Sequence, residues 1–136
     1  MKIEDFIIKL DQIPIINEDS MLKEALDEME KFKLGIVLII DTDNTLKGVI
    51  TDGDIRRLIL KEQKPMSAFL SEDISKHANF FPKTININDN LLNALNFMNQ
   101  NRIWDLPVID ERQRLVGLVH LHLALKKIIE NLVKKN

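Results

Sequence analysis

The sequence predicts an α/β (α+β) fold built from two β-α-β-β-α repeats, and three observations predict it. Fully apolar runs rich in Ile and Val alternate with segments in which apolar residues recur every three or four positions. The second half repeats the first without a gap at an offset of 69 residues, which is the separation of Ala25 from its match Ala94 (94 minus 25). The chain has 136 residues, 45% of them hydrophobic, so it has the size of one domain and can bury a core.

The first repeat opens with two short elements and a helix. Residues 2–8 are expected to form a short helix, and residues 13–16 (IPII) a short extended segment. Residues 17–20 (NEDS) are a natural N-cap cluster. Residues 21–33 then form a helix with one buried face, because its apolar side chains follow helical spacing: Leu22, Ala25, Leu26, Met29 and Phe32.

Two strands and a second helix complete the repeat. Residues 36–41 (IVLIID) form an apolar strand, residues 42–45 (TDNT) have turn chemistry, and residues 46–51 return as the next strand. The helix that follows runs to about Glu62.

The second repeat matches the first position by position. The matched pairs are Leu91 on Leu22, Leu95 on Leu26, Met98 on Met29, Asp110 on Asp41, Leu115 on Leu46 and Gly117 on Gly48. Residues 80–85 take the place of residues 13–16 and are expected to begin the second repeat with a short strand. Neither copy alone can cover both faces of its small sheet, so we expect the pair to be the folding unit.

Composition excludes several classes of function. The formal net charge is −2 and the basic residues are scattered, which argues against a nucleic-acid partner. The absence of cysteine excludes disulfides, thiolate catalysis and a Cys-ligated zinc, and it fits a reducing cytoplasm. The acidic first residues do not resemble a secretory signal, and no apolar run is long enough to span a bilayer. We therefore expect a soluble, cytoplasmic protein without a membrane partner.

Residues 48–57 (GVITDGDIRR) mark a strand that turns into a helix, and this elbow has two interpretations. In the first it binds a phosphate-bearing ligand: helix N-terminal N–H groups attract anions, Gly53 lets the backbone approach closely, and Asp54 accepts both hydroxyls of a ribose. In the second, Thr51 and Asp54 only form a capping box.

The pattern of an apolar run ending in Asp, a turn, Leu-x-Gly-apolar-x-Thr and then x-x-Asp resembles the tandem CBS module, also called a Bateman module. Its most specific segments are residues 48–54 and residues 106–110 (LPVID). Three further segments resemble the C-terminal CBS pair of bacterial arabinose-5-phosphate isomerases, which feed lipopolysaccharide and capsule biosynthesis: residues 34–37, 51–57 and 117–122.

The resemblance implies a module over residues 1–136, with pseudo-two-fold-related CBS repeats at residues 9–62 and 78–133. In that family the isomerase chemistry belongs to a preceding sugar isomerase domain, and this chain begins almost where the CBS pair would begin. We therefore expect a regulatory module, either a fragment or a detached relative of such an enzyme, that is not itself an enzyme and requires no cofactor.

The resemblance also implies one ligand site, for an adenine or cytidine nucleotide or a nucleotide-sugar. Thr51 and Asp54 match the ribose-binding pair, with Asp52 and Gly53 beside them on the elbow, and Arg56 and Arg57 face the phosphate. Backbone and apolar groups that sandwich the base are matched by Pro14, Ile15, Gly35, Ile36 and Val37.

The second repeat departs from this pattern, since His120 replaces the threonine and Leu123 the aspartate. Its helix begins without the capping pair, which favours a ligand role for Asp54 in the first repeat. His120 and His122 are expected on one side of a strand, where they contact an acidic ligand or partner, or are surface residues. A metal site is not expected, because zinc needs three or four ligands and His77 is the only other histidine.

Two apolar features remain. Trp104, which falls on Gly35, is expected either in the core or as an aromatic plug in the second pocket. The last helix carries an apolar stripe that we expect to be partly a homodimer contact: Leu125, Ile128, Ile129, Leu132 and Val133. The alternative function is therefore an oligomerisation module with an empty pocket.

No catalytic pair is expected, since Asp52 and Asp54 have no histidine or lysine nearby in sequence.

Overall fold

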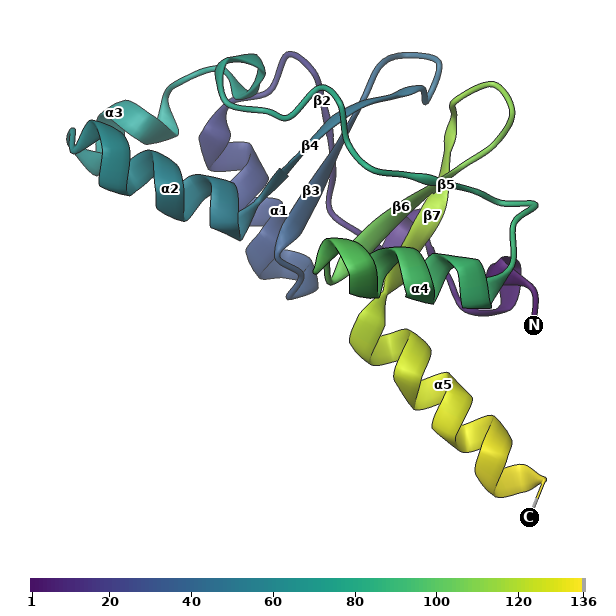
Figure 1. Ribbon diagram of the computed structural model, residues 1–136. Helices are drawn as coiled ribbons and strands as arrows, with labels where there is room; N and C mark the ends of the chain where they lie inside the picture. Colours follow the sequence, from purple (N-terminus) through teal and green to yellow (C-terminus); the bar gives the residue numbers. More distant parts are fainter. Residues whose placement is uncertain (136) are drawn as a thin grey trace. The chain divides into compact units, whose positions relative to one another are not determined.

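The computed structural model describes residues 1–135, and the chain divides into two compact units (Figure 1). The first-repeat unit is Gln12–Pro82. The second-repeat unit combines Met1–Asp11 with the chain from Lys83 onward. Each unit contains a small mixed sheet with helices packed on it, which confirms the predicted fold class. None of the described helices is both long enough and apolar enough to cross a bilayer.

The sheet of the first-repeat unit has the order β2-β3-β4, with β2 parallel and β4 antiparallel to β3. The elements in chain order are β2 (Ile15–Asn17), α1 (Leu22–Phe32), β3 (Ile36–Ile40), β4 (Leu46–Thr51), α2 (Asp52–Glu62), α3 (Met66–Leu70) and the 3-10 turn η3 (Ile74–Lys76). The helical spacing of α1 buries one face against the sheet, and its core contains Leu22, Ala25, Met29, Val37, Ile39, Ile50 and Phe69.

The second-repeat unit has the sheet order β1-β7-β6-β5. Its elements are η1 (Ile3–Asp5), β1 (Ile8–Lys9), β5 (Ile85–Asn86), α4 (Leu91–Asn101), β6 (Asp105–Ile109), β7 (Leu115–His120) and α5 (Leu121–Lys134), while η2 (Leu10–Gln12) leads into the first repeat. Its core contains Ile3, Ile85, Ala94, Met98, Leu106, Val108, Val119 and Ala124.

The repeat predicted from the sequence is confirmed in detail. The elements α4, β6, β7 and α5 each begin 69 residues after α1, β3, β4 and α2. The left-handed backbone positions also recur, with φ of 56° at Lys33 and 54° at Arg102, and of 64° at Asn44 and 65° at Gln113. The two copies therefore share turn and helix-end geometry as well as apolar pattern.

Two glycines of the repeat have a packing reason that the sequence does not reveal. A Cβ on Gly48 would lie 2.7 Å from the carbonyl oxygen of Asn79, and one on Gly117 would lie 2.7 Å from that of Ile8. In each unit a separate segment pairs antiparallel with β4 or β7 at this point, through the Val49–Asn79 bridge in one unit and through β1 in the other. Glycine is needed because another backbone approaches closely.

Three predicted details were wrong. Residues 2–8 are not one helix but the turn η1 followed by β1, because this segment pairs with β7. The strand expected in residues 80–85 begins only at Ile85, and Phe81 is 91% exposed. The N-cap of α1 is Met21, whose N–H donates to Glu24 Oε2 at 3.3 Å; the preceding residues 17–20 form a turn closed by Ser20 N–H donating to Asn17 O.

Candidate functional site

The predicted ligand residues lie together in the first-repeat unit, where β2 and β3 begin and β4 passes into α2. The N–H of Leu38 donates to Pro14 O at 2.9 Å, which places the start of β2 beside β3. On the other side of β3, Ile36 is the register partner of Thr51. The N–H of Asp52 donates to Gly35 O at 3.0 Å. Three segments distant in sequence are thereby joined along one end of the sheet.

The start of α2 is a capping box. Thr51 has extended backbone geometry, and its Oγ1 accepts the N–H of Asp54 at 3.1 Å. In return Asp54 Oδ2 accepts the N–H of Thr51 at 2.9 Å. The capping interpretation of these two residues is therefore confirmed, and each satisfies one N–H that the helix leaves without a partner.

Capping does not use up the acceptor capacity of Asp54. Its Oδ1 accepts from Arg57 Nη2 at 2.8 Å, so each carboxylate oxygen has one described partner. A carboxylate offers about four lone-pair positions, so two further donors can bind. The Asp54 side chain is 31% exposed, and these positions can meet solvent or a ligand.

The neighbouring glycines face the charged side chains of α2. A Cβ on Gly53 would lie 3.3 Å from Arg57 Nη1, so the guanidinium of Arg57 lies over Gly53. A Cβ on Gly35 would lie 2.6 Å from Asp52 Oδ2, so the Asp52 carboxylate fills the space beside the start of β3. Gly53 has no positive φ, so its backbone conformation does not require glycine.

The remaining predicted residues divide by burial. Ile36 and Val37 are buried, and Val37 belongs to the core, so their side chains are committed to packing. Ile15 and Gly35 are half-buried. Arg56 is exposed on α2, as is Arg57 with its side chain 63% exposed, which leaves both cations close to the N-terminus of the helix.

The corresponding place in the second-repeat unit has different chemistry. His120 Nδ1 lies 2.6 Å from Asp105 Oδ1, and α5 begins without a side-chain cap. His120 ends β7 whereas His122 is exposed within α5, so the prediction that both lie on one side of a strand was wrong. The core position expected for Trp104 was also wrong, since this residue precedes β6 and is 69% exposed.

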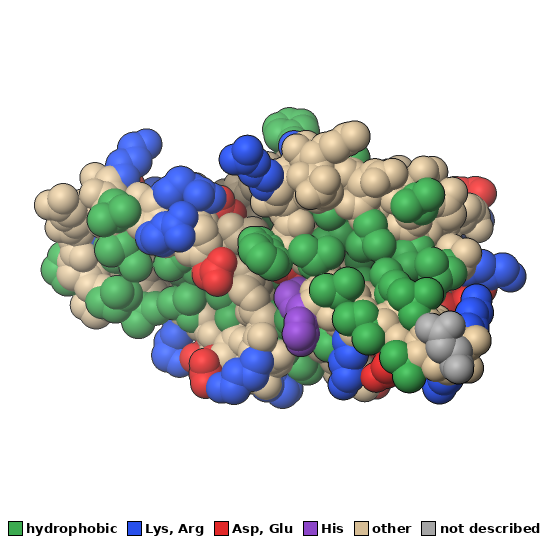
Figure 2. Space-filling model, turned by 60° about the horizontal axis from the view of Figure 1, so that its bottom comes forward, with side chains coloured by type: hydrophobic (Ala, Val, Ile, Leu, Met, Phe, Trp, Pro, Cys, Tyr) green, Lys and Arg blue, Asp and Glu red, His purple; other side chains and the backbone are tan. Residues whose placement is uncertain are grey.

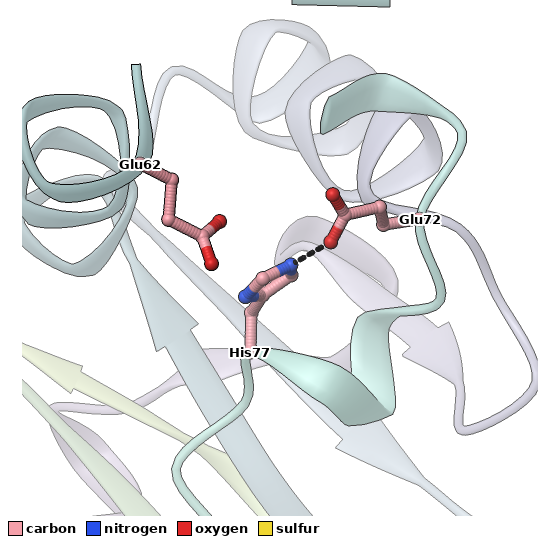
Figure 3. A group of neighbouring side chains, drawn as sticks. All are labelled: Glu62, Glu72 and His77. Atoms are coloured by element: carbon pink, nitrogen blue, oxygen red, sulfur yellow. Dashed lines mark hydrogen bonds and ion pairs between the residues drawn. The ribbon is translucent and has the colours of Figure 1, made fainter. Parts of the chain in front are cut away.

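One further cluster of side chains could not be foreseen from the sequence (Figure 3). Among the described residues, Glu62, Glu72 and His77 are the one group of three potential metal ligands whose ligand atoms all lie within 4.8 Å of one another. Hydrogen bonds from the Lys64 ammonium, first, and from His77 lower the pKa of Glu72 to about 2. These residues lie on α2, after α3 and after η3, so no spacing pattern connects them.

Comparison with known proteins agrees with this architecture. The profile of the CBS domain family matches residues 3–61 and again residues 73–130. An uncharacterized protein of Helicobacter pylori is 32% identical over 127 residues, which are 93% of this chain and 37% of that protein. The arabinose 5-phosphate isomerases KdsD of Francisella tularensis and Yersinia pestis are 30% and 32% identical over 93% and 90% of this chain, but over only 37% and 36% of their own length. The chain thus spans little more than a third of these relatives.

Solved structures show the same fold. The crystal structure of CBSX2 in complex with AMP has a TM-score of 0.82 at 21% identity and covers 95% of this chain and 96% of that one. A CBS domain pair/ACT domain protein of Thermotoga maritima has a TM-score of 0.75 at 23% identity and covers 97% and 99%. Because the family profile matches twice and covers most of the chain, this protein belongs to the CBS domain family, as two CBS domains in tandem.

Proposed function

We propose that this CBS pair senses an adenine or cytidine nucleotide, or a nucleotide-activated sugar, and regulates an arabinose-5-phosphate isomerase in the cytoplasm. The sugar isomerase domain of such an enzyme would supply the chemistry. The KdsD relatives support this choice of enzyme. The structural neighbour with bound AMP supports the choice of ligand class.

The observation that carries the proposal is the spare acceptor capacity of Asp54 at the N-terminus of α2. The two remaining acceptor positions suit the two hydroxyls of a ribose. Arg57 lies 2.8 Å from this carboxylate and Arg56 is exposed beside it, so phosphate meets two guanidinium groups and the positive end of the helix.

Regulation follows from differential binding. A ligand that prefers one conformation of the module raises the population of that conformation, and a linked catalytic domain responds to the change. The ligand can shift the equilibrium between the two conformations only by the difference between its binding free energies for them.

A thermal-shift screen with AMP, ATP, CMP, CTP and the cytidine-activated octulosonate tests the proposal. A ligand at a hundred times its Kd stabilises the fold by about 2.7 kcal/mol, which raises Tm by several degrees. Asp54→Ala should weaken binding about a hundredfold, because two charge-assisted hydrogen bonds are lost.

Asp54→Ala also removes part of a helix cap, so a matched control is needed. Asn90 caps α4 through its side-chain oxygen, which accepts the Asn93 N–H at 2.8 Å. Asn90→Ala should lower the starting Tm but keep the ligand-induced shift. A shift that persists in Asp54→Ala removes Asp54 from the site, and no shift with any ligand refutes the sensor.

The second candidate is an oligomerisation module, here a homodimer, whose pocket stays empty. Hydrophobic side chains gather on the face drawn in Figure 2. Four apolar residues of α5 are at least half exposed: Leu125, Ile129, Leu132 and Val133. An exposed apolar stripe of this kind suits a protein contact.

A further inference from the structure

The cluster formed by Glu62, Glu72 and His77 lies in the first-repeat unit at the opposite end of α2 from the capping box. Glu62 is the last residue of α2, whereas Glu72 and His77 belong to the segment that follows α3. Figure 3 shows the three side chains pointing toward one another.

The segment that carries Glu72 and His77 is held firmly. The N–H of Leu22 donates to Glu72 O at 2.9 Å, and the N–H of Ile74 donates to Ser20 O at 2.8 Å. The side chains of His77 and Glu72 are only 9% and 14% exposed. Two of the three potential ligands are therefore positioned by the fold rather than by surface rotamers.

The donor atoms define which ions fit. One imidazole nitrogen and two carboxylates match a zinc-type ion that keeps a water in its fourth position. Mg²⁺ and Ca²⁺ prefer oxygen ligands alone, so the imidazole disfavours them.

A cation already occupies the cluster. The Lys64 ammonium contacts Glu72 Oε1 and lies 3.6 Å from Glu62 Oε2, while Lys76 Nζ lies 3.2 Å from Glu72 Oε2. Lys64 is 31% exposed on a flexible stem, so its ammonium can move into water when a stronger cation arrives.

We infer that Glu62, Glu72 and His77 form a binding site for a divalent transition-metal ion of the zinc class, which displaces the Lys64 ammonium. His77 Nε2 and Glu72 Oε2 are now 2.5 Å apart. On binding they separate to about 3.3 Å, the spacing of two ligands around a tetrahedral zinc, and His77 coordinates as the neutral imidazole with its Nε2 deprotonated. The metal links the end of α2 to the segment after α3.

Calorimetric titration of the whole chain with Zn²⁺ tests the site. His77→Gln and Glu62→Gln should each weaken Zn²⁺ binding by at least about tenfold. Losing only a hydrogen-bond partner of a metal ligand already costs about that much, and these variants lose the ligand itself. Lys64→Met keeps the apolar stem and removes the competing charge, so it should tighten binding by on the order of tenfold. His122→Gln, on exposed α5, is the matched control and should bind as the wild type does.

Proton NMR of the unmodified chain gives a test that does not depend on a variant folding. The sequence has three histidines and no cysteine, so the imidazole signals are few. Zn²⁺ should shift the signals of His77, and Mg²⁺ should shift none. Zn²⁺ binding that survives His77→Gln, is lost in His122→Gln, or is not tightened by Lys64→Met would overturn the assignment.

Discussion

His120 and Asp105 face each other across β7 and β6, with Nδ1 and Oδ1 2.6 Å apart, at the positions that Thr51 and Ile36 hold in the first repeat. The same backbone elbow thus supports a helix cap in one unit and a cross-strand hydrogen bond in the other. The starts of α2 and α5 consequently differ in what they offer a ligand, although they match in geometry.

Thr51→Ala should destabilise the first-repeat unit by about 1 kcal/mol, because the Asp54 N–H loses its acceptor. Thr51→Ser keeps the hydroxyl and should cost much less. Urea unfolding of the two variants measures the difference. Equal stabilities would mean that the hydroxyl bond contributes nothing to the start of α2.

Gly48→Ala and Gly117→Ala should each destabilise the fold by about 1–3 kcal/mol, since a Cβ would lie 2.7 Å from a backbone oxygen that cannot move freely. Amide hydrogen exchange should show faster exchange at Val49 and Asn79 in the first variant and around β1 and β7 in the second. Wild-type exchange at these amides would contradict the close approach.

Gly53→Ala should leave stability unchanged or raise it by up to about 1 kcal/mol, because Gly53 has no positive φ within α2 and alanine favours a helix. The cost is small, since the atoms a Cβ would meet at 3.3 and 3.4 Å are at the end of the flexible Arg57 side chain. Thermal unfolding checks this. A clear loss of stability would show that the guanidinium of Arg57 is fixed in place.

Asp110 should make the free energy of unfolding fall at acid pH. The N–H of Arg114, first, and that of Arg112 donate to its carboxylate and hold its pKa below the ordinary value. Since the folded pKa is the lower one, this stabilisation is complete at neutral pH and disappears as pH falls from about 4 through the folded pKa. Asp110→Asn should therefore be less stable than wild type at pH 7 and approach it near pH 2. The same difference in unfolding free energy between wild type and Asp110→Asn at both pH values would refute this.

The apolar stripe on α5 should support a homodimer. Ile129→Lys should shift the chain toward monomer in sedimentation at micromolar concentration, because a charge would enter an apolar contact. Leu92→Lys is the control, since Leu92 is 67% exposed on α4 outside the stripe. A wild-type chain that is monomeric at that concentration would refute the homodimer and, with it, the second candidate function.

The elements could be predicted because each repeat has strong local signals. Helical spacing of apolar residues predicted α1 and α4. The match of Gly48 with Gly117 in the repeat predicted that β4 corresponds to β7. The errors fell where distant contacts decide the structure. Residues 2–8 have helix-forming residues, yet pairing with Leu118 and Gly117 draws Ile8 and Lys9 into a strand.

The candidate site was predictable only in part. The capping box follows from a three-residue spacing, so Thr51 and Asp54 could be read directly. The bond from His120 to Asp105 spans 15 residues, and the Glu62, Glu72 and His77 cluster depends on how three segments pack. Sequence periodicity carries no information about contacts between distant segments, so neither the His120–Asp105 bond nor the three-residue cluster could be predicted from it.

The pairing of Ile8 with Leu118 joins positions 110 residues apart (118 minus 8), whereas the first-repeat unit is one continuous segment. During synthesis the first-repeat unit can fold before β7 has been made, while Ile8 and Lys9 still have no strand to pair with. Long-range pairing of this kind raises contact order and slows folding. The two halves, so alike in form, should therefore fold one after the other, and residues 1–11, although they are made before the first-repeat unit, should settle after it.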